Sequence, residues 1–161
     1  VIAVGKIFDI FDGEGVTEKI KTTGNTNGIA FTKALQTRDF EGLAFVNLVD
    51  FDMLYGHRRD VAGYAAAATE FDKFVADFIP GMREGDILMV TADHGCDPSY
   101  TKTTDHTREY VPYLICGKGV KPGVDLGTKL CFGTIAHTIC DYLGVDASTL
   151  DGQSVLSDIL A

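Results

Sequence analysis

Residues 43–49 read LAFVNLV, and the acidic residues Asp50 and Asp52 follow them directly. An almost continuously apolar run of this kind predicts a buried strand that is covered on both faces. Residues 86–91, DILMVT, form a second such run, and it is followed by Asp93. Functional sites in open α/β sheets gather at the carboxyl ends of the strands. We therefore expect a site where these two strands end.

The rest of the chain alternates apolar runs with helical patterns, which predicts an α/β fold: a layered, mostly parallel sheet flanked by helices. Residues 12–27 are rich in Gly, Thr, Lys and Asn and are expected to form a loop. Further strands are expected at residues 1–4 and 110–116, helices from about 25 to 36, 60 to 78 and 132 to 143, and a last turn near 154–160.

The helix ends are predicted from capping and breaking residues. Asn25 or Asn27 can cap the first helix, and Asp60 can cap the second. Pro80 stops the second helix, and Pro112 places the strand at 110–116 at a sheet edge or a bulge.

Composition excludes several classes of function. The chain has 161 residues, of which 45% are hydrophobic and 23% charged, as in an ordinary globular domain. A net charge of -9 argues against nucleic acid as a partner, and no run approaches the ~20 apolar residues of a membrane span. A phosphorylated substrate remains possible, because bound divalent cations reverse the local charge. The four cysteines lack CxxC spacing and nothing marks a secreted chain, so we expect free thiols and a cytoplasmic location.

Three of the four histidines lie close to an aspartate in segments expected to be loops. The segments are DFDMLYGH (residues 50–57), ADHG (92–95) and TTDHTRE (103–109). Carboxylates combined with imidazoles suit manganese or zinc, whereas an all-oxygen set would suit magnesium or calcium. Two metal ions about 4 Å apart can hold the attacking and leaving oxygens of a phosphoryl transfer together. The pattern therefore predicts a two-metal phosphoryl-transfer site.

The strings DFDMLYGHRRD, TADHG and TDHTREYVP, in this order, resemble the phosphopentomutase family of the alkaline phosphatase superfamily. The opening VIAVGKIFDIFDGEGVT resembles the same family, so the likeness runs from Val1 to about Asp158. It implies that residues 1–161 are the C-terminal part of an alkaline-phosphatase-like catalytic core, without the N-terminal core segment and the cap domain. The family carries the transferred phosphate on a threonine of that missing segment. We therefore expect no catalytic nucleophile in this chain, and no activity from this chain alone.

The resemblance also implies the metal ligands. It assigns Asp52, His57 and His106 to one manganese ion. It assigns Asp93 and His94 to a second, which an aspartate outside this chain completes.

The activity that the resemblance implies is an isomerase reaction of nucleoside metabolism. It interconverts ribose 1-phosphate and ribose 5-phosphate, and the deoxyribose pair, using two Mn²⁺ ions and a phosphothreonine. Lys6 matches a position near the substrate phosphate, while Cys96 stands where an asparagine is expected. The alternatives are a metal-dependent phosphatase or a phosphoglycerate-mutase-like enzyme of the same superfamily, or a non-catalytic metal-binding remnant.

Two choices stay open at the level of single residues. Asp50 lies on the same strand face as Asp52 and competes with it as a metal ligand. Arg58 and Arg59 either orient a phosphate or pair with Asp60, and pairing is the favoured alternative.

Overall fold

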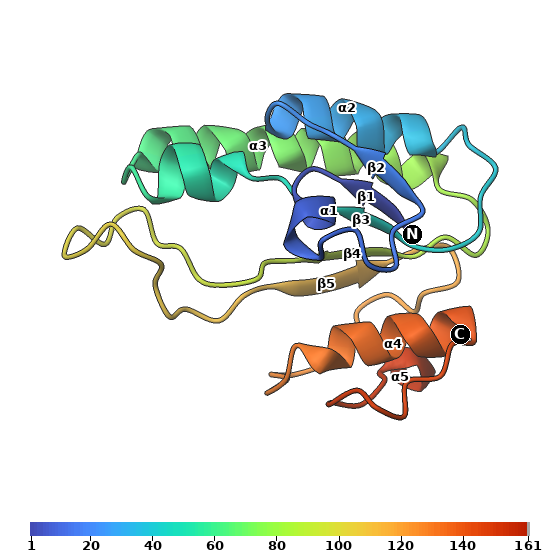
Figure 1. Cartoon of the computed structure of the whole chain (residues 1–161). Helices are drawn as coiled ribbons and strands as arrows, with labels where there is room; N and C mark the ends of the chain where they lie inside the picture. Colours follow the sequence, from blue (N-terminus) through green and yellow to red (C-terminus); the bar gives the residue numbers. More distant parts are fainter. Residues whose placement is uncertain (161) are drawn as a thin grey trace. The chain divides into compact units, whose positions relative to one another are not determined.

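Strand β1 (Ile2–Val4) is the centre of a three-stranded parallel sheet in the computed structural model, which describes residues 1–160 (Figure 1). It pairs with β2 (Glu18–Ile20) on one side and with β3 (Ala44–Val46) on the other. All three side chains of β1 are buried, as expected of a strand inside a parallel sheet. The predicted α/β fold is therefore confirmed.

Three helices accompany this sheet: α1 (Ile7–Ile10), α2 (Asn25–Leu35) and α3 (Val61–Phe78). Helix α2 packs against both β1 and α3. Its last residue, Leu35, joins Ile2 and Val4 of β1 in the hydrophobic core. Full burial of an aliphatic side chain stabilises a fold by about 1.5–3 kcal/mol, so this contact fixes α2 on the sheet.

The described chain divides into two compact units. The first comprises Val1–Arg83 and Val90–Leu114, and it contains the three-stranded sheet with α1, α2 and α3. The second comprises Glu84–Met89 and the residues from Ile115 onward. All the residues expected to bind metal belong to the first unit.

Two further strands, β4 (Leu88–Thr91) and β5 (Tyr113–Cys116), pair with each other. Both are shorter than the apolar runs that predicted them. Strand β5 begins directly after Pro112, which has no N–H to donate to a ladder. The proline therefore marks the start of the strand.

The second unit contains α4 (Gly133–Leu143) and α5 (Leu156–Ile159), which pack together. Gly144 ends α4 in the left-handed conformation, with φ 67°. The hydroxyl of the buried Thr138 accepts a hydrogen bond of 3.0 Å from the Val155 N–H, which ties the last turn of the chain to α4. Within residues 1–160, no helix is long and apolar enough to cross a bilayer.

The prediction for α3 is confirmed, and the one for residues 12–27 is wrong. The Asp60 carboxylate caps α3 by accepting a 2.9 Å hydrogen bond from the Gly63 N–H, and a short 3₁₀ turn, Ile79–Gly81, follows the helix. Residues 12–27, expected to be loop, contain β2. The side chains of β2 are charged at two of its three positions, so apolar periodicity could not find it. Its place is set by backbone pairing with β1.

The expectation that residues 43–49 are covered on both faces is also corrected. Phe45, the middle residue of β3, is 42% exposed. Its ring contacts the ring of Phe11, with centroids 6.2 Å apart, and Phe11 is itself half exposed.

Candidate metal centre

A single π-helical turn, η1 (Phe51–Gly56), follows β3 and carries Asp52. The backbone N–H of His57 donates a 2.9 Å hydrogen bond to the carbonyl of Asp52, five residues back. This bond stacks the two residues one turn apart on the same side of η1. Such π-turns occur often at functional sites, because the extra residue per turn redirects side chains.

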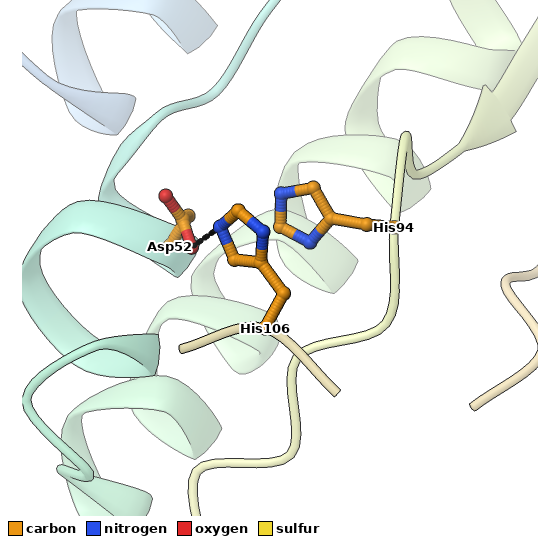
Figure 2. Close-up of side chains that lie close together, drawn as sticks. All are labelled: Asp52, His94 and His106. Atoms are coloured by element: carbon orange, nitrogen blue, oxygen red, sulfur yellow. Dashed lines mark ion pairs between the residues drawn. The ribbon is translucent and has the colours of Figure 1, made fainter. Parts of the chain in front are cut away.

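The Asp52 carboxylate lies in a cluster with three histidines, one from the end of η1 and two from later loop segments. Its Oδ2 lies 3.3 Å from Nε2 of His57, and its Oδ1 lies 3.5 Å from Nε2 of His106. Figure 2 shows this carboxylate facing the His106 ring, with the His94 ring beyond it. The rings of His94 and His106 are stacked, with centroids 3.6 Å apart and planes 20° apart.

The donor set of this cluster fits a divalent metal ion. Asp52, His94 and His106 each offer a ligand atom, and these atoms lie within 4.8 Å of one another. One carboxylate with imidazoles is a set that ions of intermediate hardness prefer. The side chains are only partly buried, from 27% exposed at His94 to 41% at His106, so an ion can reach them.

Two of the rings are oriented by backbone carbonyls. Nδ1 of His57 lies 2.5 Å from the Thr104 carbonyl oxygen, and Nδ1 of His94 lies 3.0 Å from that of Gly95. Because a carbonyl oxygen only accepts, each Nδ1 is the donor in its bond, and the tautomer that carries a single proton there has its lone pair on Nε2. Histidines that bind metals are commonly held in this way.

The structure groups the expected ligands differently from the resemblance. Asp52, His57 and His106 come together, as expected of one ion, but the ring of His94 stacks on this group. Asp93 lies at the margin, with Oδ1 3.6 Å from Nε2 of His94 and a side chain that is 83% exposed.

Lys6 extends from the end of β1 toward η1. Its Nζ lies 2.8 Å from the sulfur of Met53, the residue that follows Asp52. The parallel pairing of β1 and β3 places the carboxyl ends of both strands at the same edge of the sheet. The topology therefore brings Lys6 beside η1.

Asp50 has a structural role at the start of α2. Its Oδ2 accepts a 2.7 Å hydrogen bond from the Asn25 N–H, the first amide of α2, and its own N–H donates to Asn25 Oδ1 at 3.0 Å. Asn25 is only 5% exposed. The expected capping by Asn25 or Asn27 is wrong, because the N-cap residue is Gly24 and the Asp50 side chain supplies the acceptor.

Cys96 closes the cluster from the side of η1. Its Sγ lies 3.9 Å from Oδ1 of Asp52, and burial, with the nearby Asp52 charge, raises the pKa of the thiol. A Cβ at Gly56 would lie 2.3 Å from this sulfur, so only glycine fits there. Burial is also the main cause that raises the pKa of Tyr64, and the nearby Cys96 and Asp52 raise it further. Sequence reasoning flagged Cys96 only as a departure from a pattern, and it missed the close approach at Gly56.

Known proteins are similar to nearly the whole chain. A phosphopentomutase of Acetivibrio thermocellus is 53% identical over 160 residues, covering 99% of this chain and 41% of that protein. A phosphopentomutase of Lachnoclostridium phytofermentans is 52% identical, covering 99% of this chain and 40% of that protein. A phosphopentomutase of Anaeromyxobacter sp. is 50% identical over 159 residues, again covering 99% of this chain and 40% of that protein. The resemblance found in the motifs is thereby confirmed, and the chain spans about two fifths of the length of these relatives.

A sequence model of the Metalloenzyme superfamily matches residues 4–147. The match begins at the last residue of β1, and it includes η1 and the three segments that carry the clustered aspartates and histidines. The chain belongs to the Metalloenzyme superfamily.

Proposed function

We propose that the complete protein is a phosphopentomutase, an isomerase that interconverts ribose 1-phosphate and ribose 5-phosphate, and the deoxyribose pair. The observation that carries the proposal is the Asp52–His57–His106–His94 cluster in a chain about half identical to phosphopentomutases. In this proposal residues 1–161 are the C-terminal part of the catalytic core. The phosphothreonine, the rest of the core and the cap domain belong to the remaining length, and the enzyme works in the cytoplasm.

The proposed cofactors are two Mn²⁺ ions. Asp52, His57 and His106 would hold one, and Asp93 and His94 would contribute to the other. The contacts of Asp52 with His57 and His106 support the first set. Asp93 faces His94, its chain neighbour, and the stacking of His94 on His106 places the second set beside the first. When bound, divalent ions of this kind neutralise charge on a transferring phosphoryl group and lower the pKa of the hydroxyl that accepts it.

The residues of this chain would bind and orient. The bonds from His57 to Thr104 and from His94 to its neighbour Gly95 hold each Nε2 ready as a ligand atom. Lys6, beside η1 at the strand ends, is proposed to neutralise the substrate phosphate. Because this chain carries a net charge of -9, a local cation such as Lys6 would favour the binding of a phosphorylated sugar.

The test is made with the complete protein loaded with Mn²⁺. Incubated with ribose 1-phosphate, it should form ribose 5-phosphate faster than it releases inorganic phosphate. Faster phosphate release would instead identify a phosphatase of the same superfamily. Formation of neither product, with metal bound, would identify a non-catalytic metal-binding protein.

A further inference from the structure

Arg59 lies two residues after His57, the C-cap residue of η1, and its guanidinium is directed into the loop that precedes His106. All five N–H groups of an arginine can donate, and here all five meet backbone carbonyls. Nε and one Nη2 hydrogen reach the Thr103 oxygen at 2.8 and 2.5 Å, and the other Nη2 hydrogen reaches Asp105 at 2.5 Å. Nη1 donates to Asp97 at 3.0 Å and to Gly56 at 3.2 Å.

We propose that Arg59 is a positioning residue for the metal centre: it holds the loop of residues 97–105 so that His106 faces Asp52. This deepens the proposed function and rests on it only for the identity of the ion. Arg59 touches neither Asp52 nor His106 through its donors. It acts on the ligand through the backbone that precedes it.

The loop depends on such a clamp because its own bonds are local. An isolated bridge between Gly95 and Thr107 closes its base, with a 3.1 Å bond from the Thr107 N–H to the Gly95 carbonyl. Asp105 Oδ1 accepts from the His106 N–H at 2.8 Å, which is a turn within the loop. Bonds of this kind shape the loop but do not tie it to η1.

The ties to η1 come from three successive carbonyls. Those of Thr103 and Asp105 accept from Arg59, and that of Thr104 accepts from Nδ1 of His57. His106 follows immediately. The ligand is therefore fixed by the residues just before it, and Arg59 supplies most of the donors.

The backbone of Arg59 supports this assignment. Its φ is 55°, in the left-handed region that a residue with a Cβ seldom adopts. The turn directs the side chain back across Gly56 instead of outward with the exposed Arg58. Strain of this kind persists where surrounding contacts over-determine it, as the five bonds do here.

The two roles considered for Arg59 from sequence do not fit these contacts. Pairing with Asp60 is wrong, since Asp60 caps α3 through Gly63 and Arg59 donates to carbonyls. Orienting a phosphate would require free donors, and all five are engaged. Arg58, which is exposed, offers a matched control one residue away.

The test compares Arg59→Ala, Arg59→Lys and Arg58→Ala in the complete protein. Mn²⁺ affinity is measured by titration with the electron paramagnetic resonance signal of the free ion, and the melting temperature is measured in EDTA. We expect Arg59→Ala to weaken binding roughly tenfold or more, as is typical when a residue supporting a ligand is lost. Arg59→Lys should weaken Mn²⁺ binding to a similar extent, because a compact ammonium group cannot reach all of the carbonyls that the planar guanidinium joins. Arg58→Ala should stay within about twofold of the parent.

A rescue experiment separates positioning from general stability. Millimolar ethylguanidinium should restore part of the Mn²⁺ affinity of Arg59→Ala and leave that of Arg58→Ala unchanged. Parent-like affinity in a folded Arg59→Ala protein would overturn the proposal. If Arg59→Ala does not fold, parent-like affinity in Arg59→Lys would overturn it. A parent protein that binds no Mn²⁺ would also overturn the proposal. A parent protein that binds Mn²⁺ but has no mutase activity would count only against the proposed function.

Discussion

Nδ1 of His57 lies 2.5 Å from the carbonyl oxygen of Thr104, so this single side chain joins η1 to the loop before His106. Its other nitrogen, Nε2, lies 3.3 Å from the Asp52 carboxylate. One ring thus connects a backbone support to the centre of the candidate site. The two functions of the ring can be separated by substitution.

We predict that His57→Asn in the complete protein lowers Mn²⁺ affinity by about tenfold or more and leaves the melting temperature in EDTA close to that of the parent. An asparagine amide can occupy the place of Nδ1 and donate to Thr104, but it has no atom in the place of Nε2. Elemental analysis of the dialysed protein gives the metal content. Unchanged metal content would show that His57 is not a ligand.

Substitutions of Asp50 and Asp52 are predicted to have opposite effects on stability and on metal content. Asp50→Ala removes the acceptor for the first amide of α2, so it should lower the free energy of unfolding by about 0.5–2 kcal/mol and keep the metal content. Asp52→Asn should lose metal while its stability in EDTA stays near that of the parent. Urea denaturation and elemental analysis measure the two effects. Metal loss in Asp50→Ala without metal loss in Asp52→Asn would reverse the assignment made here.

A third prediction concerns the close approach of Cys96 to Gly56. Because an added Cβ would lie 2.3 Å from the sulfur and 3.0 Å from the Phe51 carbonyl, Gly56→Ala should destabilise the protein by about 1–3 kcal/mol. Adding Cys96→Ala removes the sulfur and should recover part of that loss, since residues in contact do not act independently. Thermal denaturation of both single variants and the double variant in EDTA measures the coupling. Strictly additive losses would mean that the sulfur is not the obstacle.

Sequence patterns could predict the elements that bury an apolar face. Helix α3 follows its apolar periodicity and its cap at Asp60, and β1 follows its apolar run. They could not predict β2, because its Glu and Lys side chains carry no apolar signal and its partner is distant in sequence. For the same reason the cap of α2 by Asp50, 25 residues away, was not foreseen.

The candidate site was predictable in its residue types but not in its connections. The aspartates and histidines stand out because they follow apolar runs, which is visible in one dimension. The stacking of His94 on His106 and the five bonds of Arg59 depend on how separate segments meet. An arginine that donates only to backbone carbonyls leaves no pattern of partner side chains in the sequence. Its charge instead suggested an ion pair with Asp60, which the structure does not contain.

The last prediction concerns the pH dependence of stability and the ion pair of Glu18 and Arg38. Two guanidinium nitrogens of Arg38 donate to Glu18, at 2.9 and 2.7 Å, and these bonds lower the pKa of the carboxyl group below its usual value of 4.5. A depressed folded-state pKa means that the stabilisation is complete above the unfolded-state pKa and is lost as the pH falls through the folded-state pKa.

Glu18→Gln should therefore melt slightly below the parent at pH 7, and this difference should disappear in acid, near pH ~3. Glu14→Gln, at an exposed position nearby, serves as the matched control and should melt with the parent at both pH values. Melting measured in EDTA keeps the metal ligands out of the comparison. A Glu18→Gln difference that persists unchanged in acid would show that the charge of Glu18 is not its source.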